Sequence, residues 1–123
     1  MIDLARAVCL TLPWPPSVNT YWRRRGHQMF ISKAGQCFRR EVFAIVHEHA
    51  DNAGYAVPLR VALTLCPPDH RRRDIDNILK SLFDALAHAG VYHDDSQIRR
   101  LHVEFSEDQE LNGVVHCLVE PIT

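Results

Sequence analysis

The sequence lacks the features that mark membrane-spanning and secreted proteins. It contains no run of about eighteen apolar residues, the length that a membrane-spanning helix requires. Its first residues, MIDLARAVCLTLPWPP, lack the basic segment and the long apolar segment of a secretion signal. We therefore expect a cytoplasmic protein with no membrane partner.

The sequence also lacks the close cysteine and histidine spacings of zinc sites. Its four cysteines form no CxxC pair and lie far apart, at Cys9, Cys37, Cys66 and Cys117. This spacing favours reduced, buried thiols over disulfides or a zinc site. The segment HEH at 47–49 lacks the HExxH spacing of zinc hydrolases, and we interpret it as helix surface.

Lysine is scarce, since 12 of the 14 basic residues are arginine. The net charge of −1 hides an asymmetry between the two parts of the chain. Residues 1–73 carry 11 basic against 5 acidic residues, whereas residues 74–123 carry 3 against 10. Arginine makes planar, bidentate contacts with phosphate, so this composition indicates a phosphate-rich partner, although solvated surface arginines would give the same count.

The 123 residues contain no repeat, linker or low-complexity tract and predict one domain, 1–123. Alternating apolar residues predict strands at 6–12, at two places within 21–31 around a turn at Gly26, and at 59–66, 99–105 and 114–120. Apolar residues at spacings of three and four predict helices at 33–50, with Ser32 as N-cap, and at 74–88, ending at Gly90. The sum is an α+β fold, a mixed β-sheet packed against two helices in a single small domain.

The stretch HRRRDIDNILKSLFDAL, residues 70–86, places three arginines, Arg71, Arg72 and Arg73, directly before Asp74 and Asp76. Within a regular helix, residues two apart point about 200° from each other and could not bind one ion. In an extended or capping segment the two aspartates would share a side. Two interpretations remain open, because aspartate is also a preferred N-cap and acidic residues suit the first turn of a helix.

A further pair of acidic residues, Asp94 and Asp95, follows the second helix in VYHDDSQI. Aspartates followed by serine are also ordinary turn residues. Three carboxylates without cysteine or histidine ligands suit a hard ion such as Mg²⁺. Lys80 lies one turn beyond Asp76, where it either pairs with Asp76 or Asp84 or holds the scissile phosphate or its attacking water.

Three segments together resemble one family. They are LTLPWPPSVNTYW (10–22), ISKAGQCFRREV (31–42) and RRRDIDNILKSLFDALAHAGVYHDDSQI (71–98), and they are similar to the RusA family of Holliday junction resolvases. The resemblance implies a homodimeric, Mg²⁺-dependent endonuclease of DNA recombination and repair. Such an enzyme cuts four-way DNA junctions symmetrically and has no small-molecule cofactor. The segment 104–113 matches little, so no role is carried over there.

The resemblance also assigns roles to individual residues. It implies catalytic, metal-binding aspartates at Asp74, Asp76 and Asp95, a catalytic Lys80 that also faces DNA, and a phosphate contact at Arg73 beside Arg71 and Arg72. Arg23 and Arg24, with Arg25 at the same hairpin tip, form either a second DNA contact or a solvated turn. Trp14, Tyr21 and Trp22 could wedge into an open junction, but packing in the core or a dimer is favoured.

Three functions from different classes therefore remain open. The first is a structure-specific endonuclease acting on four-way junctions. The second is a DNA-binding module in which the aspartates only cap a helix, and the third is a metal-dependent hydrolase of nucleotides or other phosphoesters.

Overall fold

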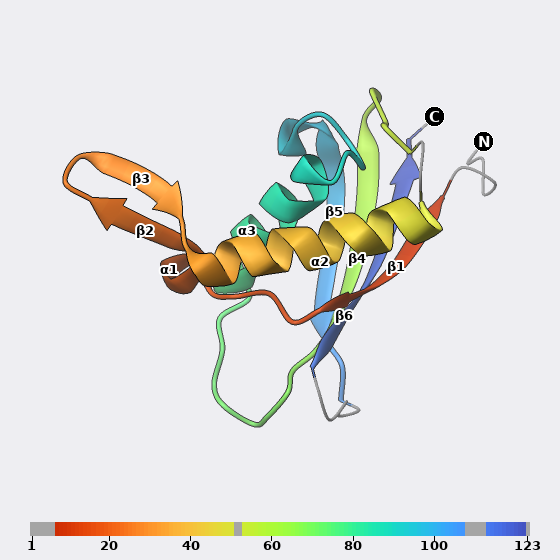
Figure 1. The fold of residues 1–123 in the computed structure, drawn as a ribbon. Helices are drawn as coiled ribbons and strands as arrows, with labels where there is room; N and C mark the ends of the chain where they lie inside the picture. The colour runs from red at the N-terminus through yellow and green to blue at the C-terminus, as the bar shows by residue number, and fades with distance from the viewer. Residues whose placement is uncertain (1–6, 51–52, 108–112, 123) are drawn as a thin grey trace.

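The sheet at the centre of the protein is mixed, as predicted. The computed structural model describes residues 7–50, 53–107 and 113–122. Its four-stranded sheet has the order β1-β6-β4-β5, with β1 at Val8–Pro13, β4 at Leu59–Cys66, β5 at Ile98–Phe105 and β6 at Val114–Pro121 (Figure 1). β4 and β5 are parallel, and the other neighbours are antiparallel. Position 6, where we expected the first strand to begin, lies outside the described residues.

The helix α3, Asp76–His88, connects the two parallel strands. Parallel neighbours require the chain to travel back along the sheet between them, and α3 makes this return. The loop before α3 and the turn after it consequently lie at opposite ends of the sheet, as Figure 1 shows. The acidic residues before α3 and those after it therefore lie at opposite ends of the sheet.

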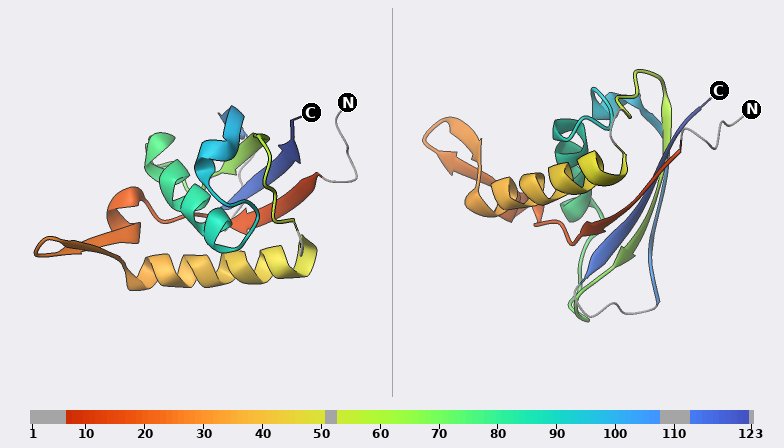
Figure 2. Two further views of the ribbon diagram at one scale, coloured as in Figure 1. Left: turned by 90° about the horizontal axis from the view of Figure 1, so that it is seen from above. Right: turned by 45° about the vertical axis from the view of Figure 1, so that its right-hand side comes forward.

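Both long helices pack on the same face of the sheet (Figure 2). α2 spans Lys33–His49, and its predicted N-cap is confirmed because the Ser32 hydroxyl accepts a hydrogen bond from the Gly35 N–H at 3.0 Å. The helices and β4 share a buried apolar core that includes Phe38, Val42, Val46, Val61, Leu63, Leu65, Leu82 and Leu86. Burial of this core is the main force that holds the helices to the sheet.

A two-stranded hairpin projects beyond the sheet, formed by β2, Trp22–Arg25, and β3, Gln28–Ile31 (Figure 1). Gly26 has a φ of 60°, which confirms the turn. Two single-turn elements were not predicted from the sequence: α1 at Val18–Tyr21 and a 3₁₀ helix, η2, at Asp95–Gln97. Elements this short contain too few residues to show a hydrophobic period.

The cysteine expectation is right about the free thiols and only half right about burial. Cys66 and Cys117 are buried, whereas Cys9 and Cys37 are exposed, and all four thiols are free. Burial raises the pKa of the Cys117 thiol to about 12. Among the described residues, no helix is both long enough and apolar enough to cross a membrane.

Candidate functional site

The first two candidate aspartates lie where the loop after β4 meets the start of α3. α3 begins at Asp76, two residues later than we expected, and its N-cap is Ile75, which makes no side-chain capping bond. The Asp74 carbonyl accepts a hydrogen bond from the Asn77 N–H at 3.3 Å, but its carboxylate caps nothing. The capping interpretation of Asp74 is therefore wrong. Asp74 belongs to the loop and Asp76 to the first helical turn.

The side chains of Asp74, Asp76 and Lys80 are exposed. In the part of the chain that the structure describes, none of the three makes a side-chain hydrogen bond or ion pair. The alternative that Lys80 pairs with Asp76 or Asp84 is wrong, because Asp84 pairs with Arg39 instead. Two carboxylates and an amine therefore face solvent together, with no structural partner to explain them.

The segment WPPS lies beside Asp74. Trp14, Pro15, Pro16 and Ser17 line a depression of about 420 Å³ whose other wall is formed by Arg72, Arg73, Asp74, Asn77 and Ile78. The Arg73 guanidinium lies 5.4 Å from the centre of the Trp14 ring, a cation–π distance. Asn77 was not predicted as a site residue, although its position three residues after Asp74 indicated that it would share this wall.

The three arginines of the loop differ in how firmly they are held. Arg73 is only 18% exposed, pairs with Asp69 at 2.8 Å and donates to the carbonyl oxygens of Asp69 and Arg71. Arg71 is 84% exposed and approaches Asp69 only to 3.8 Å, while Arg72 is exposed as well. The Arg71 backbone N–H and then the Arg73 guanidinium lower the pKa of Asp69. Arg73 therefore shapes the loop, and Arg71 and Arg72 are better placed to bind phosphate.

The two acidic residues after α3, Asp94 and Asp95, differ in the hydrogen bonds that their carboxylates accept. Asp94 is the N-cap of η2: its carboxylate accepts from the Ser96 N–H at 3.1 Å, and the Asp94 N–H donates to the Gln97 side chain at 2.9 Å. Hydrogen bonds from the side chain and backbone of Ser96 lower the pKa of Asp94. Asp95 is exposed and, within the described ranges, its carboxylate makes no hydrogen bond or ion pair.

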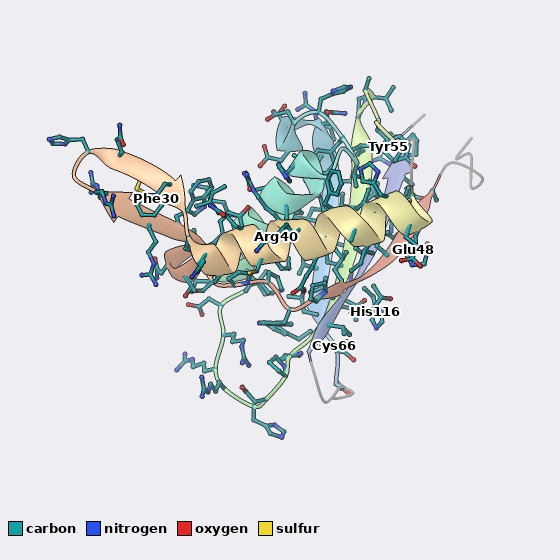
Figure 3. The ribbon with its side chains drawn as sticks, viewed as in Figure 1. Phe30, Arg40, Glu48, Tyr55, Cys66 and His116 are labelled. Carbon is teal, nitrogen blue, oxygen red and sulfur yellow. The ribbon has the colours of Figure 1, made fainter. Side chains whose placement is uncertain are left out.

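Asp95 lies at the opposite end of α3 from Asp74 and Asp76. At 1.5 Å per residue, α3 places about 18 Å between Asp76 and His88. The Gln97 side chain in η2 donates to the Tyr55 carbonyl at 2.9 Å. Figure 3 shows Tyr55 at the far end of the sheet from Cys66, the last residue of β4.

The three predicted metal ligands are therefore not together within one copy of the chain. Across residues 7–50, 53–107 and 113–122, no three histidine, cysteine or acidic side chains gather closely enough to hold a metal ion. The sequence alone suggested that the turn after the helix could bring Asp95 back to the other two aspartates. The turn does not bring Asp95 back, because α3 ends at the end of the sheet opposite Asp74 and Asp76.

The hairpin combines exposed arginines with exposed apolar side chains. Arg23 pairs across the strands with Phe30, and Arg24 pairs with Met29. Met29 is 60% exposed and Phe30 44% exposed, and Figure 3 shows Phe30 on the hairpin, away from the sheet. Neither Met29 nor Phe30 was predicted as a site residue from the sequence, although hairpin pairing opposite the arginines was an available signal. Arginines beside exposed aromatic rings are typical of surfaces on which nucleic acid bases stack.

A half-buried polar network joins α1, α2 and α3. Arg39 of α2 pairs with Asp84 of α3 at 2.8 Å, and its Nε donates to the Tyr21 hydroxyl at 2.9 Å. The Tyr21 hydroxyl in turn donates to Asp84. Burial and then Asp84 raise the pKa of Tyr21. Tyr21 is fully buried, which confirms the packing alternative for this residue.

Comparisons with known proteins agree on one family. The model of the family described as endodeoxyribonuclease RusA matches residues 13–115. The chain is 48% identical over 92 residues to a crossover junction endodeoxyribonuclease of Enterobacteria phage HK97, covering 75% of this chain and 77% of that protein. It is 43% identical over 89 residues to the protein of that name from Shigella sonnei and 42% identical over 89 residues to that of Escherichia coli K12, covering 72% of this chain and 74% of each relative.

Proposed function

Because the chain belongs to the RusA family of endodeoxyribonucleases, we propose that it cuts four-way DNA junctions in recombination and repair. One observation within the site carries the proposal. The carboxylates of Asp69, Asp84 and Asp94 have structural partners, whereas the side chains of Asp74, Asp76, Asp95 and Lys80 have none in the described residues. Exposed charges without partners are those available to a metal ion and a phosphate.

The chemistry of these donors fits Mg²⁺, since the ion prefers carboxylate oxygens and keeps several waters. When bound, Mg²⁺ would neutralise the phosphodiester, lower the pKa of a bound water and stabilise the leaving oxygen. Asp74 and Asp76 would supply carboxylates from one side. Lys80, one turn along the same helix face, would hold the scissile phosphate, and Arg71 and Arg72 would bind the flanking phosphates.

A second copy of the chain is part of the proposal for two reasons. A four-way junction has two-fold symmetry, and an isologous dimer supplies two matched active sites for paired cuts. The second reason is the position of Asp95, which lies too far from Asp74 and Asp76 to share an ion with them inside one chain. We propose that each site combines Asp74 and Asp76 of one copy with the Asp95 that the second copy supplies.

The function is tested with a labelled four-way junction and a linear duplex of matched sequence, each incubated with Mg²⁺ or with EDTA. We expect cleavage of the junction alone, and only with Mg²⁺. Binding without cleavage, unaffected by EDTA, would instead support a DNA-binding module. Hydrolysis of mononucleotide substrates with little dependence on salt would support a small-molecule phosphoesterase.

The shared site is tested by mixing inactive variants. In a mixed dimer of Asp76→Asn and Asp95→Asn chains, one site carries both changes and the other is intact. We expect each variant alone to be inactive and the mixture to regain nicking of junctions. Mixing Asp74→Asn with Asp76→Asn is the matched control, because both sites are then defective. If the first mixture regains no more activity than the control, Asp95 does not act across the dimer.

A further inference from the structure

We propose that Ser81 and Trp14 are positioning residues for the cleavage of DNA. Ser81 fixes the segment WPPS, residues 14–17, on α3, and Trp14 in that segment holds Arg73 and the loop around it. The inference rests on the proposed function for the reaction and adds two uncharged residues to it. Neither residue can replace a metal ligand or neutralise a phosphate, so each acts through the loop that carries Asp74.

Ser81 is a polar residue at a fully buried position of α3, with 0% of its surface exposed. Its hydroxyl oxygen lies 2.7 Å from the Pro16 carbonyl oxygen and 3.1 Å from the Ile78 carbonyl oxygen. A hydroxyl has one proton to donate, so the shorter contact, to Pro16, is the main hydrogen bond. Alanine forms helices better than serine, and the helix therefore gains nothing from a serine here. The bond instead joins α3, one residue after Lys80, to a segment 65 positions earlier.

The backbone between Trp14 and Pro16 has little freedom once the Pro16 carbonyl is held. Proline fixes its own φ near −65°, and two consecutive prolines follow Trp14. A residue that precedes proline is restricted as well, which limits the backbone of Trp14 itself. Pro15, between the two, is buried. The hydrogen bond from Ser81 consequently also fixes the backbone that carries the Trp14 ring.

The Trp14 ring is the surface against which Arg73 lies. The Arg73 guanidinium is 5.4 Å from the ring centre, within the range of a cation–π interaction. Its Nη1 donates to the carbonyl oxygens of Asp69 and Arg71 at 3.2 Å each, and its Nη2 pairs with the Asp69 carboxylate at 2.8 Å. Arg73 thus closes the loop that leads into Asp74. Without the ring, the guanidinium would lose one side of its support and the loop its fixed shape.

The shape of the loop matters because it alone positions Asp74. The Asp74 side chain is exposed and, within the described residues, makes no hydrogen bond or ion pair. A displacement of about 1 Å at a reacting group can lower a rate on the order of a hundredfold. The exposed Arg71 and Arg72 have long side chains that still reach phosphate after a small shift of the backbone. We therefore expect loss of Ser81 or Trp14 to slow cleavage much more than it weakens binding.

The test combines two substitutions singly and together. Single-turnover cleavage at saturating Mg²⁺ and junction affinity are measured for Ser81→Ala, Trp14→Leu and the double variant. We expect Ser81→Ala to slow cleavage about fivefold and Trp14→Leu at least about tenfold, with affinities within about threefold of the parent protein. Because Ser81 acts through Trp14, the double variant should be no slower than Trp14→Leu. Trp14→Phe keeps an aromatic face for Arg73 and should recover most of the parental rate.

Ser32→Ala is the matched control for a general loss of stability. Ser32 is also buried, and its hydroxyl donates to the Thr20 carbonyl at 2.6 Å, so the same substitution removes the same kind of bond elsewhere. We expect Ser32→Ala to unfold at a urea concentration no higher than that of Ser81→Ala and yet to cleave junctions at the parental rate. Equal slowing by the two variants would mean that Ser81 contributes to stability alone.

A second measurement requires neither DNA nor activity. An aromatic ring shifts the NMR resonances of protons that lie over its face upfield, so the side-chain protons of Arg73 report whether Trp14 is in place. We expect Ser81→Ala to reduce this upfield shift and Ser32→Ala to retain it. An unchanged shift in Ser81→Ala would show that Ser81 does not hold Trp14 against Arg73.

The kinetic results can also overturn the proposal. It is wrong if Ser81→Ala and Trp14→Leu cleave like the parent, if Trp14→Phe is as slow as Trp14→Leu, or if the double variant shows the product of the two separate losses. A parent protein that cuts no junction would contradict the proposed function alone, since the Arg73 resonances still test the contact between Ser81, Trp14 and the loop. A parent that cuts junctions while the variants keep its rate would contradict only the positioning role.

Discussion

The first turn of α3 and the middle of the same helix carry similar charges in different settings. The side chains of Asp76 and Lys80 are exposed and make no hydrogen bond or ion pair within the described residues, whereas the Asp84 carboxylate is bound by Arg39 and Tyr21. An acidic residue's position in the sequence therefore does not fix its role. A carboxylate whose oxygens already have donors contributes to folding, and one without donors is available to a ligand.

The largest expected effect comes from replacing an exposed aspartate. Asp76→Asn keeps the volume of the side chain and removes the charge that a metal ion requires, so we expect junction cleavage to fall at least about a hundredfold. Binding should be retained or improved, because a negative charge that faces DNA is lost. Single-turnover cleavage and gel-shift binding measure the two effects. Cleavage near the parental rate would remove Asp76 from the metal site.

Replacement of Asp84, whose carboxylate is bound by Arg39 and Tyr21, should reduce stability. Asp84→Ala leaves the half-buried Arg39 guanidinium and the Tyr21 hydroxyl without their acceptor, so the free energy of unfolding should fall by about 1–3 kcal/mol. Asp74→Ala is the matched control and should change it by less than about 0.5 kcal/mol. Urea unfolding measures both values. Equal losses in the two variants would show that the distinction between held and exposed acids is wrong.

A smaller effect should separate the arginines of the loop. Arg72→Ala removes an exposed charge, so the slope of log K against log salt for junction binding should decrease by about 1. Arg73 already faces Asp69, and Arg73→Ala should change the slope less. Titrations at four or more salt concentrations give both slopes. Equal changes would indicate that Arg73 leaves Asp69 to contact phosphate directly.

The smallest expected effect is at Asp94, whose carboxylate caps η2. Asparagine caps a helix about as well as aspartate, so Asp94→Asn should change stability by no more than a few tenths of a kcal/mol and leave cleavage intact. The neighbouring change, Asp95→Asn, should abolish cleavage at the same stability. Thermal unfolding and the junction assay, applied to both proteins, compare them. Loss of cleavage in both variants would mean that the two aspartates act as one unit.

Much of the fold could be predicted because its signals are local. The hydrophobic periods predicted both long helices and the four strands of the central sheet to within two residues, and placed the two hairpin strands within 21–31 without their inner bounds. Ser32 and Gly26 marked a helix start and a turn that the structure confirms. These signals act between residues a few positions apart, where steric and hydrogen-bonding preferences operate on the sequence directly. Short elements such as α1 escaped prediction because one turn carries no period.

The sequence by itself also determined which residues are candidates for chemistry, since the spacing of Asp74, Asp76 and Lys80 after three arginines is a property of the chain. Only the tertiary structure decided how the charges are used. Asp84 meets Arg39, 45 positions earlier, through the packing of two helices. Asp95 lies far from Asp74 because β4 and β5 are parallel, and parallel strands force α3 to span the length of the sheet. Strand direction is set by the packing of the whole domain, so no local pattern near either aspartate could have revealed the separation.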